Sequence, residues 1–258
     1  MSKLIFVTGA SSGIGQALAW RYYQDGYDLA LVARRTQDMQ AWATKQGLAE
    51  SRYQIYGADV AVIDSIVAAA RLCLERQGVP DVVIANAGVS IGVDTAVRGD
   101  LDVLVQTFAI NNVGLAATFH AFIDPMVQRG SGALVGIGSV AGIRGLPGHG
   151  AYCASKAAVI GYCESLRGEL RHAGVKVVTI CPGYIDTPLT QKNRYAMPFL
   201  MQPEVFAEKA FRAIGAGASY RVIPWQMGWV AKGLRLLPNW LFDKVLSGRP
   251  RKRRANEV

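Results

Sequence analysis

The sequence predicts a doubly wound α/β domain, built on a mostly parallel seven-stranded sheet with helices on both faces, and a C-terminal amphipathic tail. Two observations predict it. Short apolar runs alternate with longer amphipathic stretches, and continuous apolar runs suit strands that a parallel sheet buries on both faces. Strand–helix alternation also implies right-handed crossovers, which place helices on both sides of the sheet.

The elements follow one another in this alternating order. The expected strands are Leu4–Val7, Leu29–Val32, Tyr53–Tyr56, Val82–Ala85, Ala133–Ile137, Val175–Ile180 and Arg221–Ile223. The expected helices lie between them, at 14–25, 36–46, 61–77, 100–128, 151–172 and 203–215. Glycine marks the joints at positions 13, 26, 78, 130, 174 and 217. We find no repeat and no break in composition before about residue 224, so we expect one domain at 1–224 and a tail at 225–258.

Composition narrows the class of protein. Hydrophobic residues make up 51% of the 258 positions, enough for a large core. No apolar run reaches the roughly 18 residues of a membrane-spanning helix, and the chain enters a strand pattern at once, so we expect neither a spanning helix nor a signal peptide. The four cysteines lack metal-type spacing and the three histidines form no ligand motif. We therefore expect reduced thiols, no metal site and a cytoplasmic protein.

A glycine-rich turn follows the first expected strand. Gly9, Gly13 and Gly15 surround Ser11, Ser12 and Ile14, directly before the first helix. Glycine lets the backbone approach a ligand closely, and the N-terminus of a helix offers free N–H groups and a partial positive charge to a pyrophosphate. The spacing G-x-x-x-G-x-G differs from the commoner G-x-G-x-x-G. The turn predicts a dinucleotide site.

The end of the second expected strand indicates which dinucleotide binds. Sites for NAD usually carry an acid here, which holds the 2′-hydroxyl of the adenosine ribose. This chain has Ala33 followed by Arg34 and Arg35, and guanidinium groups suit a phosphate. We favour NADP(H) over NAD(H); the alternative is a solvated basic loop.

Tyr152 and Lys156 lie four residues apart in an expected helix, so their side chains share one face. An ammonium beside a phenol favours the phenolate, and we expect it to lower the pKa of Tyr152 from about 10. Such a phenol is a usable general acid or base near neutral pH.

Together these motifs resemble the short-chain dehydrogenase/reductase family, in its single-domain, Rossmann-type branch, from about residue 3 to 224. The motifs that carry the resemblance are the glycine turn, Asn86-Ala87-Gly88, Asn111-x-x-Gly114, Ser139, Tyr152-x-x-x-Lys156 and Pro182-Gly183-x-x-x-Thr187. The resemblance implies that Asp59 and Val60 contact adenine. It also implies that Asn86 lies beneath the adenosine ribose and helps to hold the central strands. The backbone at Ile185 and the hydroxyl of Thr187 would hold the nicotinamide carboxamide.

The resemblance also implies the chemistry. A hydride moves between the nicotinamide and a carbonyl or carbinol carbon of a small-molecule substrate. Tyr152 exchanges the proton, while Lys156 lowers the pKa of the phenol and holds the nicotinamide ribose. Ser139 orients the substrate oxygen. Asn111 would anchor a water that links Lys156 to solvent. The alternative interpretation is that Asn111 is an ordinary polar residue within a helix. The family's helix pair, here 100–128 and 151–172, commonly builds homodimers and homotetramers.

Residues 183–202 form the expected substrate loop, and the loop is rich in apolar and aromatic side chains. Two readings remain open. The side chains line a hydrophobic substrate pocket and exclude water, or they complete the core of the domain.

The tail combines apolar residues, tryptophans and most of the positive charge. Eight lysines and arginines and two acids lie from Lys232 onward, which gives +6 of the net +9. Pro238 should divide the tail into two short helices, with Asn239 as a cap for the second. The last stretch, Arg249–Val258, is expected to be disordered. The tail either docks on the body or on a second subunit, or it makes a peripheral contact with an anionic membrane. Nucleic-acid binding fits poorly, because no nucleic-acid motif accompanies the charge.

Three functions remain in competition. The first is an NADP(H)-dependent carbonyl reductase or alcohol dehydrogenase. The second is an oxidative hydroxy-compound dehydrogenase that works in the opposite direction. The third is a catalytically silent dinucleotide-binding module that its tail recruits to a membrane. Loss of the tyrosine or the lysine would mark a silent module, and both residues are present.

Overall fold

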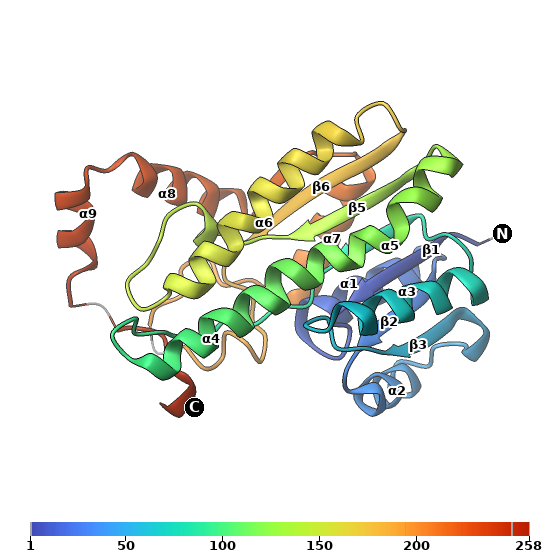
Figure 1. Cartoon of the computed structure of the whole chain (residues 1–258), viewed down its shortest axis with the longest axis horizontal. Coiled ribbons are helices and arrows are strands. Elements are labelled where there is room, and N and C mark those ends of the chain that lie inside the picture. The colour runs from blue at the N-terminus through green and yellow to red at the C-terminus, as the bar shows by residue number, and fades with distance from the viewer. Residues whose placement is uncertain (1, 194, 249, 258) are drawn as a thin grey trace.

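The computed structural model describes residues 2–193, 195–248 and 250–257, and its framework is one parallel sheet (Figure 1). The strands are β1 (Leu4–Thr8), β2 (Asp28–Ala33), β3 (Tyr53–Gly57), β4 (Val82–Ala85), β5 (Gly132–Ile137), β6 (Val175–Pro182) and β7 (Tyr220–Ile223). Their order across the sheet is β3-β2-β1-β4-β5-β6-β7, and every neighbouring pair is parallel. The predicted fold class is confirmed.

Helices cover both faces of this sheet. The α-helices of the described residues are α1 (Gly13–Gln24), α2 (Thr36–Lys45), α3 (Ile63–Arg76), α4 (Arg98–Phe108), α5 (Gly114–Arg129), α6 (Gly150–Glu169), α7 (Pro203–Gly215), α8 (Trp225–Leu236) and α9 (Asn239–Leu246); α8 and α9 lie beyond the sheet (Figure 1). One core layer joins the sheet to α3, α5 and α6, through residues such as Ile66, Phe122 and Val159. The other joins it to α1, α2 and α7, through residues such as Leu18 and Phe206. The strands are therefore buried on both sides, as their apolar runs predict.

The expected helix at 100–128 is interrupted in the structure. A π turn, Ala109–Val113, separates α4 from α5. Such turns are rare and occur often at functional sites. Its effect here is to bury Asn111 between the loop after β4 and helix α6.

The tail begins with two helices that pack against the body. Pro238 separates α8 from α9, as predicted. Asn239 is not the cap of α9, because Pro238 holds that position; the amide oxygen of Asn239 accepts a hydrogen bond from Arg144 instead. Arg144 also donates to the carbonyls of Leu234 and Leu237 at the C-terminal end of α8 and stacks on the ring of Phe242. Within the described residues, no helix is both long enough and apolar enough to cross a membrane.

The end of the chain is ordered against the body, which corrects the expectation of a disordered basic end. We name residues 250–257 the C-terminal strap; Arg249 and Val258 lie outside the described residues. The Arg254 guanidinium pairs with the buried carboxylate of Asp100 through two hydrogen bonds, of 2.6 and 3.1 Å. These bonds lower the pKa of Asp100. The Gly92 N–H also donates to the Arg253 carbonyl at 2.8 Å.

Candidate functional site

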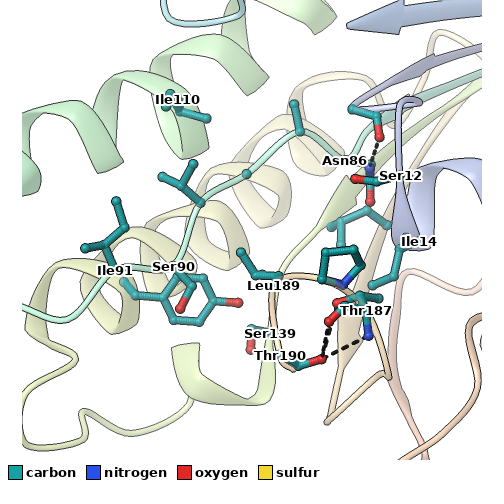
Figure 2. A pocket seen from close by; sticks show the side chains of 18 of the residues that line it. Ser12, Ile14, Asn86, Ser90, Ile91, Ile110, Ser139, Thr187, Leu189 and Thr190 are labelled. Atoms are coloured by element: carbon teal, nitrogen blue, oxygen red, sulfur yellow. Dashed lines mark hydrogen bonds between the residues drawn. The ribbon is translucent and has the colours of Figure 1, made fainter. Parts of the chain in front are cut away.

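A cleft of about 640 Å³ opens at the carboxyl ends of the strands. It lies where strand order reverses between β1 and β4, the usual ligand position in doubly wound sheets. All but two of the site residues predicted from the sequence line the cleft. The two exceptions are Gly15, which lies under the glycine turn, and Asn111, which is buried behind the wall. Figure 2 shows Ser12, Ile14, Asn86, Ser139 and Thr187 gathered around this hollow.

The glycine turn is packed too tightly for side chains. Gly9 has a φ of +69°, and a Cβ there would lie 2.9 Å from the backbone of Ala87. A Cβ on Gly15 would lie 2.3 Å from the Gly9 carbonyl oxygen. The turn therefore depends on glycine both for its conformation and for its packing. The Gln16 amide closes it further by donating to the Ser11 carbonyl.

Asn86 and Thr8 fasten the ends of the two central strands together. The Asn86 amide donates to the Thr8 carbonyl at 2.9 Å and, at 3.4 Å, to the Gly9 carbonyl. The Thr8 hydroxyl in turn accepts the backbone N–H groups of Asn86 and Ala87 at 3.0 and 3.1 Å. The predicted role of Asn86 in holding the central strands is visible in these contacts. Thr8 was not among the site residues predicted from the sequence, although a hydroxyl at the end of a buried strand is a usable signal.

Two arginines lie at the end of β2, at the rim of the cleft. Arg34 is 3.6 Å from the carboxylate of Asp59, and Arg35 is 2.8 Å from that of Asp38. Both guanidinium groups are largely exposed, so these ion pairs are weak. Arg35 also reaches the hydroxyl of Ser11 in the glycine turn at 3.2 Å. Both side chains are therefore free to turn toward a phosphate.

The far end of the cleft is shaped by the start of the substrate loop. Thr190 accepts the Thr187 N–H at 3.0 Å and donates to the carbonyl of Ile185, so the two threonines lie together (Figure 2). Ile185 is buried and forms a bridge to Met201. The loop is thus pinned at both ends. Thr190 is a cleft residue that the sequence motifs do not single out.

Tyr152, Lys156 and Ser139 meet in this cleft, but the phenol and the ammonium interact weakly. The Lys156 amine donates to the Ile137 carbonyl at 2.8 Å and lies 5.9 Å from the Tyr152 ring centre. Burial raises the pKa of Tyr152 to about 12, and a hydrogen bond with Ser139 offsets only part of this. The expectation of a lowered phenol pKa is wrong, because desolvation of the buried phenol outweighs the effect of the distant ammonium. Burial also lowers the pKa of Lys156 to about 8.

Asn111 uses its side chain to fix neighbouring backbone. Its amide oxygen accepts the Val89 N–H at 2.9 Å, and its amide nitrogen donates to the Val89 carbonyl and the Ser155 hydroxyl. Gly88 lies between Asn111 and Lys156, so a Cβ at this position would approach both side chains. These bonds use both N–H donors of the side-chain amide, so a water held by this side chain would have to donate to its oxygen.

A second hollow, of about 600 Å³, adjoins the cleft, and we name it the substrate chamber. Helix α8 supplies much of its apolar lining: Met227, Val230, Ala231 and Leu234. His149 also lines it, and burial together with the charge of Lys252 lowers the pKa of this imidazole to about 4, which keeps it neutral. The inner face of the tail is thus part of the site.

Both readings of the substrate loop apply, to different residues. Tyr184, Leu189 and Tyr195 line the chamber. Ile185 belongs to the core and Met201 packs against it. Phe199 and Leu200 are exposed and serve neither purpose. Residue 194 lies outside the described residues.

The sequence shows significant similarity to known proteins across most of its length. A family model described as short chain dehydrogenase matches residues 3–197. An uncharacterized oxidoreductase of Myxococcus xanthus is 38% identical over 241 residues, which is 93% of this chain and 95% of the relative. A 2-(R)-hydroxypropyl-CoM dehydrogenase of Xanthobacter autotrophicus is 32% identical, over 84% of this chain and 88% of the relative.

Solved structures with the same fold include complexes with either nicotinamide cofactor. A short chain dehydrogenase/reductase from Burkholderia phymatum, in complex with NAD, superposes with a TM-score of 0.80 at 23% identity, over 89% of this chain and 92% of the other. An alcohol dehydrogenase from Thermococcus sibiricus, complexed with 5-hydroxy-NADP, gives a TM-score of 0.76 at 26% identity, over 86% of this chain and 95% of the other.

Proposed function

Because the chain belongs to the short-chain dehydrogenase/reductase family, we propose that it is an NADP(H)-dependent oxidoreductase that transfers a hydride between nicotinamide and a carbonyl or secondary alcohol. The proposed substrate is a small molecule with a hydrophobic portion, because the substrate chamber is lined largely by apolar and aromatic side chains. Membership of the family establishes that the chain is an oxidoreductase that uses a nicotinamide dinucleotide. Our proposal adds the preference for the phosphorylated cofactor, the class of substrate and the direction of the reaction.

One observation carries the proposal: Ser139 and Tyr152 line both the cofactor cleft and the substrate chamber. Their hydroxyls are therefore at the junction where a bound dinucleotide and a bound carbonyl would meet. A hydride donor and a proton donor have to reach adjacent atoms of one substrate, and this junction satisfies that requirement.

The chain's own residues supply the rest of the chemistry. A bound nicotinamide would supply the hydride. Ser139 donates a hydrogen bond to the substrate oxygen and orients it. Tyr152, whose pKa of about 12 keeps it protonated at neutral pH, gives its proton to the oxygen as negative charge develops there. Lys156 contributes positive charge and hydrogen-bond donors beside the phenol.

A screen of apolar ketones and secondary alcohols with NADPH, NADH and their oxidised forms tests this function. We expect oxidation of NADPH by at least one ketone. Turnover only of alcohols would favour the oxidative dehydrogenase. Cofactor binding without turnover across both panels would favour the silent dinucleotide-binding module and contradict the proposal.

Cofactor preference provides the first mutational prediction. Arg34→Asp combined with Arg35→Ala should reverse or erase a preference for NADPH, because the change removes two cations and introduces an acid directly after Ala33, the position where NAD sites usually carry one. The loss should be about tenfold or more in NADPH affinity, since a charged hydrogen bond contributes roughly 1.5–3 kcal/mol. Fluorescence titration with both cofactors measures it. Equal affinity of the unaltered protein for NADH and NADPH would contradict the assignment.

We also propose that the protein is a homodimer or homotetramer, through the face that α4, α5 and α6 present. Val105 is 64% exposed on α4, and Leu101 and Tyr162 are also exposed on this group of helices. Val105→Glu should shift the mass measured by light scattering toward the monomer, because a charge at an apolar contact is unfavourable. An unaltered monomeric mass in both forms would contradict an oligomer.

A peripheral contact with an anionic membrane is a further proposal for the tail. Trp225, Trp229 and Trp240 are 66, 69 and 70% exposed on the outer side of α8 and α9. Lys232, Arg235 and Lys244 interleave with them, the combination typical of an interfacial helix. The basic strap is held against the body, so these helical cations replace it as the proposed electrostatic partner.

Vesicle co-sedimentation tests this contact. The protein should bind vesicles that contain phosphatidylserine more strongly than neutral ones, and added salt should weaken the binding. Trp225→Ala with Trp229→Ala should remove most of it, because both side chains are exposed and their loss spares the core. Equal sedimentation of this variant and the unaltered protein, or no binding by either, would contradict the proposal.

A further inference from the structure

The C-terminal strap bridges the two loops that form the mouth of the cofactor cleft. On one side, the Gly92 N–H donates to the Arg253 carbonyl, and Arg254 pairs with Asp100 at the start of α4. On the other side, the Lys252 amine donates to the Leu189 carbonyl at 3.2 Å and to the amide oxygen of Asn193 in the substrate loop. The strap therefore places consecutive basic residues over the cleft rather than in solvent.

Two of these basic residues face the site without a counter-charge among the described residues. Lys252 is only 9% exposed, and its amine donates to a neutral carbonyl and a neutral amide oxygen. Burial lowers its pKa, and the nearby Lys192 lowers it further. The Nε of Arg253 is buried and has no hydrogen-bond partner. Burying a cation without an anion is unfavourable, so this arrangement is incomplete by itself.

The lining of the cleft as a whole also carries more positive than negative charge. Among the described residues its charged lining consists of Arg34, Arg35, Lys156, Lys192, Lys252 and Arg253, against the single carboxylate of Asp59. That carboxylate is already near Arg34. A hollow with so large an excess of positive charge favours an anionic ligand.

We propose that Lys252 and Arg253 bind an oxyanion, a phosphate or a carboxylate, within the cleft. This oxyanion could come from two sources. The first is the diphosphate of the dinucleotide, because both residues line the cleft that holds the glycine turn. Only this first source rests on the proposed function. The second source is an acid group on the substrate, because Lys252 also lines the substrate chamber. In either case the strap is part of the binding site and not a solvated end.

The test compares three variants of the full chain, all with substitutions in the C-terminal strap. Lys252→Gln with Arg253→Gln removes the two charges that face the cleft. Arg251→Gln is the matched control, because Arg251 belongs to the same basic run but lines neither hollow. Arg254→Gln removes the tie to Asp100 and reports on the position of the strap. Circular dichroism and the melting temperature establish that each variant is folded.

The first arm measures dissociation constants for NADPH and for inorganic pyrophosphate, at several salt concentrations. If the diphosphate is the ligand, the Lys252→Gln, Arg253→Gln form should bind both at least about tenfold more weakly, with a shallower salt dependence. Arg251→Gln should match the unaltered protein. Arg254→Gln should weaken binding to a smaller degree, because the two charges remain but their position is less fixed.

The second arm uses the thermal shift of the cofactor-saturated protein with 4-acetylbenzoate and with acetophenone. If the ligand is an acid group on the substrate, 4-acetylbenzoate should stabilise the unaltered protein and lose that effect in the double variant. Acetophenone should act alike on both.

Unchanged responses of the double variant in both arms would overturn the oxyanion site. Failure of the unaltered protein to bind either nicotinamide cofactor would instead overturn the proposed function. Inorganic pyrophosphate and 4-acetylbenzoate would then still decide the oxyanion site, and absence of binding by both would overturn it as well.

Discussion

Tyr152→Phe is expected to lower kcat by about a hundredfold to ten-thousandfold, the usual contribution of a positioned general acid. The affinity for NADPH should stay within about twofold, because the ring that packs in the site is retained and only the hydroxyl is lost. Stopped-flow turnover with a ketone found in the screen, together with fluorescence titration, separates these two quantities. Tyr162→Phe is the matched control, because Tyr162 belongs to the same helix and lines neither hollow.

The pH dependence should identify the phenol as an acid and not as a phenolate. With a pKa of about 12, Tyr152 carries its proton throughout the neutral range, so ionisation of the phenol should not limit reduction between pH 6 and 9. Lys156, with a pKa of about 8, loses its charge as the pH rises through that value. Reduction should therefore be level below pH 8 and should decline above it. Appreciable turnover by Tyr152→Phe would contradict the assigned role.

The glycine turn and the proposed catalytic pair could be found from the sequence because their chemistry is local. Gly9 and Gly13 are required where a strand turns into a helix, and Tyr152 and Lys156 share a helix face by spacing alone. The strands were predicted within two residues, because continuous apolar runs fix a buried parallel strand. These features need no knowledge of the tertiary contacts.

The features that the sequence did not reveal depend on contacts between distant segments. The raised pKa of Tyr152 comes from burial, which the Tyr–Lys spacing cannot report. The strap looked disordered because its composition is polar and basic, yet Asp100, about 150 residues earlier, supplies the carboxylate that orders it. The π turn at Asn111 is accompanied by hydrogen bonds to Val89 and Ser155. The spacing of apolar residues along a helix gives no information on such contacts between distant segments.

Gly15→Ala should abolish measurable NADPH binding and lower the free energy of unfolding by about 1–3 kcal/mol, the usual cost of overpacking. Gly15 is in helix α1, where alanine is intrinsically favoured by about 1 kcal/mol. Packing reverses that preference. The added Cβ would lie 2.3 Å from the Gly9 carbonyl oxygen and 2.8 Å from the Asn86 amide nitrogen, so the glycine turn itself would have to move.

Gly233→Ala separates the helix preference from the clash. Gly233 is also within a helix, α8, but a Cβ there would meet nothing within 4 Å. This variant should gain about 0.5–1 kcal/mol and bind NADPH normally. Chemical denaturation and NADPH titration of both variants give the comparison. If Gly15→Ala were as stable as Gly233→Ala and bound NADPH as the unaltered protein does, the close packing of the turn would not be what positions the diphosphate.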